Sequence, residues 1–303
     1  MRAALLREVD GPFELADLPD PDAEGRVVVR VRAAGVNFAD ILIRRGRYPQ
    51  MPELPAVLGT EVAGELDDGT RVMAITPGSG GYAENVAVER AQVVALPEHA
   101  TFAEGASFLL TFLTAYIPLT RQVRLRPDAV VLVHAAAGGV GTAAVQVARS
   151  LGARVIAAAG STEKLDLCRE LGAAEAYVYD EIPDHLRVDV VVDPVGGALF
   201  ERALGRLRPL GTLIAIGFAA GMWPEIDPAN LVGRNVGIDG FYLGRLLRHE
   251  PEVVGEAVGE LLALWQAGAL RPVVGAEIPL AEVDRAHELV ESRTSVGKVV
   301  LVP

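Results

Sequence analysis

Cysteine is almost absent from this chain of 303 residues, which contains only Cys168. A single thiol excludes a disulfide within the chain and a metal centre built from several cysteines. Cys168 falls with Leu165 and Leu171 on the apolar face of an expected helix, so we expect it in the core. The histidines are too dispersed to form a local ligand pair, so no metal site is predicted; they stand at positions 99, 134, 185, 249 and 287.

Lysine is scarce as well, with Lys164 and Lys298 as the only two, so arginine carries nearly all of the positive charge. The formal net charge of −12 disfavours nucleic acids and anionic membranes, which attract proteins through a concentrated positive field. Long apolar runs are lacking, because none approaches the roughly 20 residues of a membrane span. The N-terminus has no apolar signal core, so we expect a cytoplasmic protein without a membrane partner.

The pattern of expected strands and helices changes near residue 100, and this change indicates a domain boundary. Before it, short β-branched runs are punctuated by Gly, Pro and Asp, as in a partly open antiparallel barrel; strands are expected at 1–6, 27–31, 60–66, 71–75 and 86–96, with a helix at 38–45. After it, strands alternate with helices, as in an open parallel sheet; the strands are expected at 129–133, 154–159, 176–179, 188–193, 212–217 and 236–242. Helices are expected at 140–151, 163–171, 198–206 and 253–265.

The closing stretch returns to the texture of the first part, with strands at 273–278 and 299–302 around a helix at 281–291. A chain of this length exceeds the size at which single cores stop growing, about 250 to 300 residues. We therefore expect an α/β protein of two domains. A β-rich, partly open barrel is expected over 1–100 and 266–303, and a Rossmann domain with a doubly wound parallel sheet over 101–265.

A buried strand runs directly into a glycine-rich turn that opens a helix, between Val130 and Gly141. Glycines at 138 and 141 let the backbone approach a phosphate and let the helix pack on the strand, while the unpaired N–H groups of the helix end attract anionic oxygens. With the strand at 154–159, the segment forms a βαβ unit of about 30 residues. It predicts dinucleotide binding at Ala137, Gly138, Gly139, Val140 and Gly141; the alternative is a turn that merely connects two elements.

The end of the next strand favours NADPH over NADH. Enzymes that use NAD place an acidic residue there, about 20 residues after the glycines, to hold the ribose 2′-hydroxyl. No carboxylate stands at this strand end, whereas the Ser161 hydroxyl and the Lys164 charge both suit a 2′-phosphate. The alternative is that Ser161 only caps the following helix and Lys164 is a solvated surface charge.

Six segments, in order, resemble the zinc-free quinone oxidoreductase (zeta-crystallin-like) branch of the medium-chain dehydrogenase/reductase superfamily. They are the stretches 34–40 (AGVNFAD), 58–64 (LGTEVAG), 80–84 (GGYAE), 114–116 (TAY), 135–141 (AAAGGVG) and 297–301 (GKVVL). The resemblance covers nearly the whole chain. It implies a GroES-like catalytic domain beside the Rossmann domain, and a homodimer formed near the strand at 236–242.

Zinc-dependent relatives carry Gly-His-Glu where this chain has Gly59-Thr60-Glu61, and a cysteine where it has Ala34-Gly35. Their lobe of four cysteines is missing too. The resemblance thus implies a reductase without zinc, in agreement with the cysteine count.

The resemblance also implies the roles of individual residues. Lys164, Tyr179 and Arg293 match the positions that hold the 2′-phosphate, although Tyr179 reads equally as a strand aromatic and Arg293 as a cation at a helix end. Gly217 and Phe241 are expected to contact the cofactor as well. Asn37 and Tyr48 are expected beside the nicotinamide, with Asp40 orienting them. Each of these three has a structural alternative: Asn37 as a helix cap, Asp40 as a solvated helix residue and Tyr48 as a loop anchor.

The function that this implies is hydride transfer from NADPH to a quinone. The first alternative is reduction of an enone or alkenal, and the second is an NADPH-binding protein with little catalysis. Leu42 keeps the second alternative open, because several relatives have a tyrosine there. In either reductase the partner is a small molecule, and developing charge on its oxygen must be met by hydrogen-bond donors in place of a metal.

Overall fold

The computed structural model describes residues 1–23, 25–76 and 78–303. The chain forms two compact units, one made of Met1–Leu110 with Pro272–Pro303 and the other of Thr111–Arg271. The predicted domains, 1–100 with 266–303 and 101–265, have limits several residues away from those of the two units. The predicted domain boundaries therefore stay a prediction. The second unit is inserted into the chain of the first, so that the first unit combines segments from both ends of the sequence.

The second unit contains a six-stranded sheet of parallel strands in the order β11-β10-β9-β12-β13-β14. The strands are β9 (Val130–Val133), β10 (Arg154–Ala159), β11 (Glu175–Val178), β12 (Val188–Asp193), β13 (Leu207–Ala215) and β14 (Gly237–Gly240). The chain moves outward in one direction from β9 and then returns to place β12 on its other side. Such a reversal of strand order is where doubly wound sheets bind ligands, at the carboxyl ends of the strands. The predicted Rossmann fold is confirmed.

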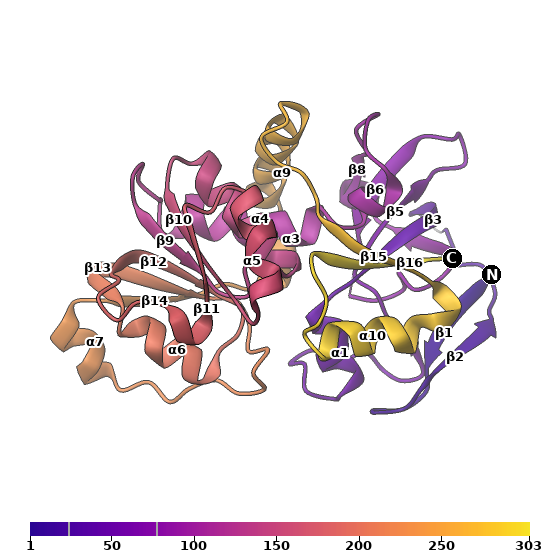
Figure 1. The fold of residues 1–303 in the computed structure, drawn as a ribbon. Helices are drawn as coiled ribbons and strands as arrows, with labels where there is room; N and C mark the ends of the chain where they lie inside the picture. Colours follow the sequence, from indigo (N-terminus) through magenta and orange to yellow (C-terminus); the bar gives the residue numbers. More distant parts are fainter. Residues whose placement is uncertain (24, 77) are drawn as a thin grey trace. The chain divides into compact units, whose positions relative to one another are not determined.

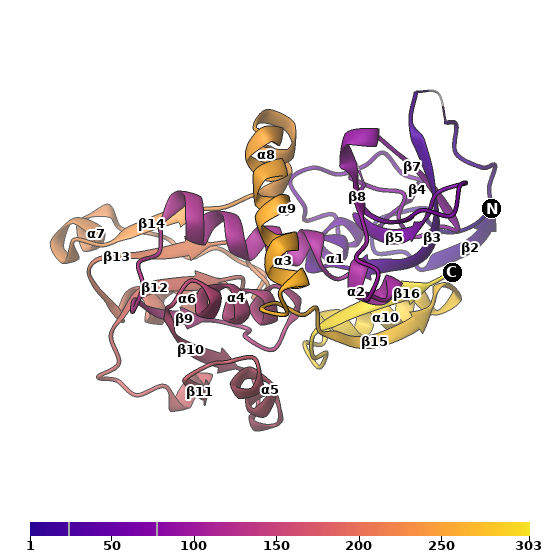
Figure 2. The ribbon, with the colours of Figure 1, turned by 90° about the horizontal axis from the view of Figure 1, so that it is seen from above.

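Helices precede, separate and follow these strands along the chain, and those that come directly after β9, β10 and β12 pack against the sheet. They are α3 (Leu109–Ile117), α4 (Gly139–Ser150), α5 (Leu165–Glu170), α6 (Gly197–Leu204), α7 (Pro228–Arg234), α8 (Leu243–His249) and α9 (Pro251–Gln266). Figure 2 shows α8 running on into α9. Phe200 and Ala203 of α6 pack with Leu132 and Val191 of the central strands into one core. Cys168 on α5 is fully buried, as predicted.

The described residues of the first unit form two sheets whose strands are antiparallel, except that β15 and β16 pair in parallel. One has the order β15-β16-β3-β5-β6-β8, with β7 also paired to β3, and the other has the order β2-β1-β4. The strands are β1 (Arg2–Leu6), β2 (Phe13–Asp17), β3 (Val27–Val36), β4 (Ala56–Val57), β5 (Glu61–Glu65), β6 (Arg71–Ile75), β7 (Asn85–Val88), β8 (Val93–Ala95), β15 (Val274–Pro279) and β16 (Lys298–Val302). Its helices are α1 (Phe38–Arg44), α2 (Phe102–Gly105) and α10 (Val283–Glu291). The sheet does not close into a barrel, which confirms the predicted β-rich, open architecture.

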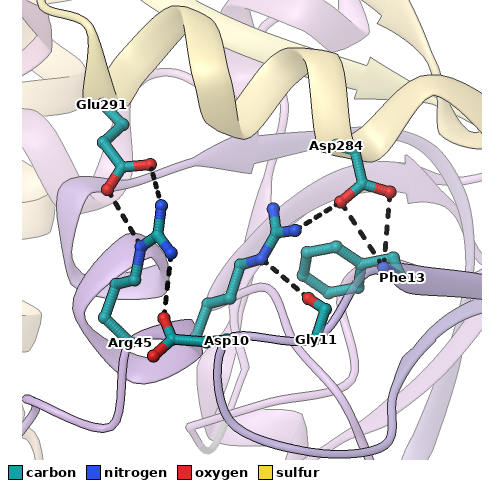
Figure 3. A network of polar contacts seen from close by, with 7 residues as sticks. Asp10, Gly11, Phe13, Arg45, Asp284 and Glu291 are labelled. Carbon is teal, nitrogen blue, oxygen red and sulfur yellow. Dashed lines mark hydrogen bonds and ion pairs between the residues drawn. The ribbon is translucent and has the colours of Figure 1, made fainter.

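Ion pairs connect α10 to the N-terminal part of the first unit. Figure 1 shows α10, in yellow, beside α1 and the β1–β2 hairpin. Arg45, just after α1, binds Glu291 at 2.8 Å and Asp10 at 2.9 Å, while Arg44 binds Asp284 at 2.6 Å (Figure 3). Asp284 also accepts a hydrogen bond from the backbone N–H of Phe13 at 3.3 Å. The Arg45–Glu291 and Phe13–Asp284 contacts join residues that are 246 and 271 positions apart in the sequence.

One prediction about apolar runs is wrong. The helical segment Phe102–Gln122 has 21 residues and a mean hydropathy of 1.4, so by length and composition it could cross a membrane. In the structure 83% of its apolar window is buried, as is usual for a core helix of a globular protein. No unbroken apolar run marks this segment in the sequence, because Thr111, Thr114 and Thr120 interrupt the apolar residues without making the segment hydrophilic.

Several elements differ from the predicted ones. The expected strand at 86–96 is two strands, because a 3-10 turn at Arg90–Gln92 interrupts it. The expected helix at 163–171 begins as a 3-10 turn at Thr162–Lys164 before α5. Strands β2 and β4 and helices α2, α3, α7 and α8 were not predicted. Their sequences are short or, in α3, largely apolar, so they lack a clear period of two or of 3.6 residues.

Candidate functional site

The glycine-rich turn of the second unit has the geometry of an anion-binding helix end. It follows β9, whose four residues are all buried, and it leads into α4 with Gly138 as N-cap. A Cβ on Gly141 would lie 2.0 Å from the carbonyl oxygen of Ala135, so only glycine allows the helix to pack this closely on the turn. No side chain caps α4, and the N–H groups of Gly139, Val140 and Gly141 are in the first turn, where helices leave donors unpaired. A phosphate placed there would meet these donors and the positive helix end.

Tyr179 lies against this turn. Its hydroxyl accepts a hydrogen bond from the backbone N–H of Ala135 at 3.2 Å, and its ring stands edge to face with His134 at 6.0 Å. A Cβ on Gly160, at the end of β10, would lie 3.9 Å from the Tyr179 ring. The structure therefore brings together the glycine turn, the end of β10 and Tyr179.

Ser161 and Lys164 follow the end of β10, on the 3-10 turn at Thr162–Lys164. Both side chains are half-buried, and partial burial lowers the pKa of Lys164. The Ser161 hydroxyl bonds the carboxylate of Glu163, which lowers the pKa of Glu163. The carboxylate of Glu163 thus stands two residues after Ser161, the residue expected to hold the 2′-phosphate. It lies on the exposed side of the turn, beyond the strand end.

Two other expected cofactor residues lie at the carboxyl ends of neighbouring strands. Gly217 follows β13, and a Cβ there would come within 3.1 Å of the carbonyl oxygen of Pro194. Phe241 follows β14, is buried, and donates its backbone N–H to the carbonyl of Ala215 at 2.9 Å. Both are therefore at the edge of the sheet where doubly wound folds bind ligands.

A buried histidine–aspartate pair that the sequence did not reveal lies beneath the glycine turn. Nδ1 of His134, directly after β9, is 3.1 Å from Oδ1 of Asp193, and both side chains are at most 2% exposed. Asp193 also accepts the backbone N–H groups of Val195 and Gly196 at 3.0 and 3.1 Å. The pair joins the ends of β9 and β12 at the point where the strand order reverses.

In the first unit, Asn37 is the centre of a buried polar cluster. Its side-chain amide donates to Oγ1 of Thr60 at 3.3 Å and to Oε1 of Glu61 at 3.1 Å, while its carbonyl oxygen accepts from the ammonium of Lys298. Lys298 also pairs with Glu61. Asn37, Glu61 and Lys298 are buried, and Thr60 is half-buried. The side chain of Asn37 thus turns toward β5 and β16, while its backbone begins α1.

Asp40 lies on the buried side of α1, which contradicts its alternative reading as a solvated helix residue. It is fully buried, and its Oδ2 accepts from the backbone N–H of Asn37 at 2.8 Å and from the Tyr82 hydroxyl at 2.9 Å. Oδ1 has no hydrogen-bond partner among the described residues. Burial raises the pKa of Asp40 to about 6 and raises that of Tyr82 as well. Asp40 therefore holds the start of α1 in place, while its expected role in orienting the site stays a prediction.

Three further residues singled out in the sequence also lie in the first unit. Tyr48 follows α1, is half-buried, and packs against the core of the first unit. Leu42 is buried on α1. Arg293, in a left-handed conformation with φ of 60°, follows α10 and belongs to the first unit. Within the part of the chain that the structure describes, no three metal-ligating side chains gather at one place.

Sequence reasoning did not assign a role to Thr60, Glu61, Tyr82 or Lys298. All four fall inside segments that carry the family resemblance, so a signal was present. What it did not reveal is that strands β5 and β16 bring Glu61 and Lys298 to the same side chain, Asn37.

Two family models match the chain. One, described as an alcohol dehydrogenase GroES-like domain, matches residues 23–98, and the other, described as a zinc-binding dehydrogenase, matches residues 139–261. Among curated proteins, a quinone oxidoreductase-like protein 2 homolog of Nematostella vectensis is 34% identical over 99% of this chain and 88% of its own length. A synaptic vesicle membrane protein VAT-1 homolog of Rattus norvegicus is 33% identical over 94% of this chain and 79% of its own length.

Solved structures resemble the chain over its whole length. The quinone oxidoreductase of Thermus thermophilus, described with its NADPH complex, has a TM-score of 0.94 and 45% identity, with 100% of both chains covered. An Escherichia coli quinone oxidoreductase complexed with NADPH has a TM-score of 0.90 and 30% identity, covering 100% of this chain and 99% of its own.

Proposed function

Because the chain belongs to the zinc-free quinone oxidoreductase branch of the medium-chain dehydrogenase/reductase superfamily, we propose that it is an NADPH-dependent reductase of quinones. That it is an oxidoreductase of this superfamily follows from the relatives. The quinone as substrate and the individual site residues are the proposal.

The observation that carries the proposal is the glycine turn at Gly138–Gly141 with Tyr179 beside it. A Cβ at Gly141 would overlap the turn, and no side chain caps the first-turn N–H groups of α4. These features fit the pyrophosphate of a dinucleotide. The solved relatives described with NADPH share this fold, which supports the same nucleotide here.

The proposed residues divide by what they hold. Ala137, Gly138, Gly139, Val140 and Gly141 would hold the pyrophosphate through their backbone. In the second unit, Ser161, Lys164 and Tyr179 would hold the 2′-phosphate, and Gly217 and Phe241 would contact the cofactor. In the first unit, Arg293 is the residue proposed for the 2′-phosphate, and Asn37 and Tyr48 are those proposed for the nicotinamide. When bound, NADPH supplies the hydride that reduces the acceptor.

The chain's own residues supply the environment for that transfer. Partial burial keeps Lys164 poorly solvated, which strengthens its attraction to a phosphate. Asp40 and Tyr82 fix the start of α1, where Asn37 is located. Donors from side chains meet the charge that develops on the acceptor oxygen.

Stopped-flow oxidation of NADPH tests the proposal, with one panel of quinones and one of enones and alkenals. We expect turnover with quinones at rates well above those with the enones. Turnover of enones alone would favour the alternative reductase. Tight NADPH binding with no oxidation by any acceptor would favour a binding protein.

We also propose that the protein is a homodimer that forms at β14, the edge strand of the described parallel sheet. Two large apolar side chains near this edge are highly exposed, Leu210 at 88% and Val232 at 77%. Exposed apolar side chains at a sheet edge favour association. Light scattering of the wild-type protein and of Val232→Asp tests this proposal, since a dimer that uses this edge should dissociate in the variant.

A further inference from the structure

The side chain of Asn37 has no hydrogen-bond donor left for a substrate. Its amide nitrogen carries two hydrogens, and these point to Thr60 at 3.3 Å and Glu61 at 3.1 Å. Its carbonyl oxygen already accepts from Lys298. A role for Asn37 as the donor to an acceptor molecule would require the buried cluster to break.

Thr60 differs from its neighbours because its hydroxyl accepts a hydrogen bond and gives none within the described residues. The hydroxyl proton is therefore available. Its position is firmly held. The backbone oxygen of Thr60 accepts from the N–H of Thr76 at 2.9 Å, and the preceding Gly59 packs so closely on Tyr82 that a Cβ would lie 2.5 Å from its ring. The side chain is half-buried, so the proton is also accessible.

Lys298 supplies charge at the other end of the same chain of hydrogen bonds. The ammonium donates to Asn37, the amide of Asn37 donates to Thr60, and the Thr60 hydroxyl is the last member. Hydrogen bonds in such a chain polarise one another, and the effect is stronger in a buried environment. Since Asn37, Glu61 and Lys298 are all buried, the Thr60 proton becomes a better donor than that of an isolated threonine.

We propose that the Thr60 hydroxyl donates a hydrogen bond to the acceptor's carbonyl oxygen while that oxygen gains negative charge. This inference rests on the proposed function and names the group that replaces a metal in it. Thr60 is the catalytic residue in this scheme, and Asn37 and Lys298 are positioning residues.

Atoms and electrons balance in this reduction without any change in the protonation of Thr60. The acceptor would gain a hydride, which is one hydrogen with two electrons, and bound NADPH would supply it and become NADP⁺. In a quinone the new bond leaves one oxygen as a phenolate, and in an enone it leaves an enolate. A proton from solvent then completes the hydroquinone or the saturated ketone, while Thr60 keeps its own proton throughout.

The test compares Thr60→Val, which removes the hydroxyl but keeps the branched shape, with Thr60→Ser, which keeps the hydroxyl. Thr212→Val, a half-buried threonine on β13 of the other unit, is the matched control. We expect Thr60→Val to lower kcat for quinones on the order of 100-fold, as for loss of one oxyanion donor. Thr60→Ser should recover most of this loss, and the NADPH dissociation constant should change less than threefold in both variants.

A second measurement does not depend on turnover. The dissociation constant of 4-nitrophenolate, which carries its charge on an oxygen like the reduced acceptor, is followed by its absorbance. We expect at least fivefold weaker binding to Thr60→Val than to wild type or Thr60→Ser. Thermal unfolding measures whether the variants are folded. If Thr60→Val does not fold, Thr60→Ala takes its place in both measurements.

The outcomes separate this inference from the proposed function. A wild-type protein that reduces no quinone or enone would overturn the proposed function and the inference with it. A wild type that reduces quinones while Thr60→Val keeps its rate would overturn the inference alone. The inference would also be overturned if wild type and Thr60→Val bound 4-nitrophenolate equally, or if neither bound it.

Discussion

The ammonium of Lys298 pairs with the carboxylate of Glu61 where the two side chains are only 4% and 1% exposed. A buried pair stabilises a fold only while both charges are present, because either charge alone keeps the cost of its desolvation. We expect Lys298→Met to lower the free energy of unfolding by about 3–5 kcal/mol. Urea unfolding followed by fluorescence measures this.

The double variant Glu61→Gln/Lys298→Met is the control for this prediction. Without the charge on Glu61 the missing ammonium no longer leaves a lone ion, so most of the lost stability should return. Equal destabilisation in the single and double variants would show that packing of the lysine stem matters more than its charge.

Lys164→Ala should weaken NADPH much more than NADH. A hydrogen bond to a charged group contributes about 1.5–3 kcal/mol, which corresponds to roughly tenfold or more in affinity. Fluorescence titration with each nucleotide measures the two dissociation constants. Arg169→Ala, an exposed cation on α5 paired with Asp166, is the control and should change neither constant. Equal loss for both nucleotides in Lys164→Ala would mean that Lys164 does not read the 2′-phosphate.

Gly141→Ala should abolish nucleotide binding. The added Cβ would lie 2.0 Å from a backbone oxygen of the turn, so α4 must move away from β9. Gly255→Ala, on α9 with nothing within 4 Å of the new Cβ, is the matched control and should be stabilised by about 0.5–1 kcal/mol. Titration with NADPH and thermal unfolding measure both effects. Retention of wild-type affinity in Gly141→Ala would contradict the tight packing described for the turn.

The raised pKa of Asp40 predicts a contribution to stability that falls as pH rises. Burial raises this pKa from 3.8 to about 6 in the folded protein, so between these values the folded state holds a proton that the unfolded state has lost. Stability from this group is complete below pH 4 and is lost as the pH passes 6, a change of up to roughly 3 kcal/mol. Unfolding of wild type and Asp40→Asn from pH 4 to 8 should show a difference that changes across this window. A constant difference would mean that Asp40 does not titrate there.

The contribution of His287 to stability depends on pH in the opposite sense to that of Asp40. Neither ring nitrogen has a hydrogen-bond partner among the described residues, and burial, with Arg44 and Arg45 nearby, lowers its pKa to about 3. Below pH 6.5 the unfolded state takes up a proton that the folded state does not, so stability is lost as the pH falls from 6.5 towards 3. His287→Phe, which keeps a ring beside Phe13, should resist acid better than wild type. Equal loss of stability at about pH 5 in both proteins would refute this.

The sequence predicted the regular parts of the fold well. The strands at 71–75, 154–159 and 188–193 have the predicted limits, since each is a short β-branched run bounded by Gly, Asp or charged residues. The glycine turn was also recognisable, because the strand, the turn and the helix follow one another directly. Local signals of this kind need no knowledge of the rest of the chain.

The buried cluster around Asn37 was not recognisable in the same way. Glu61 and Lys298 look like surface charges in the sequence, and only the pairing of β16 with β3, next to β5, brings them together. Asp40 was expected to orient the site, but nothing local shows that its helix face is buried. Contacts between strands that are distant in the sequence depend on topology, which single-sequence patterns do not specify.

Asn37 and Lys298 are 261 positions apart, and this separation sets an order of events during synthesis. The second unit lies wholly between them, so a ribosome has made all of β9 to β14 before β16 is available to join β3. Until then the Glu61 carboxylate lacks the ammonium of Lys298. The ion pairs of Arg44 and Arg45 with α10 also form only after the second unit has been made. A nascent chain can therefore form its nucleotide fold early, while the polar cluster of the first unit is completed last.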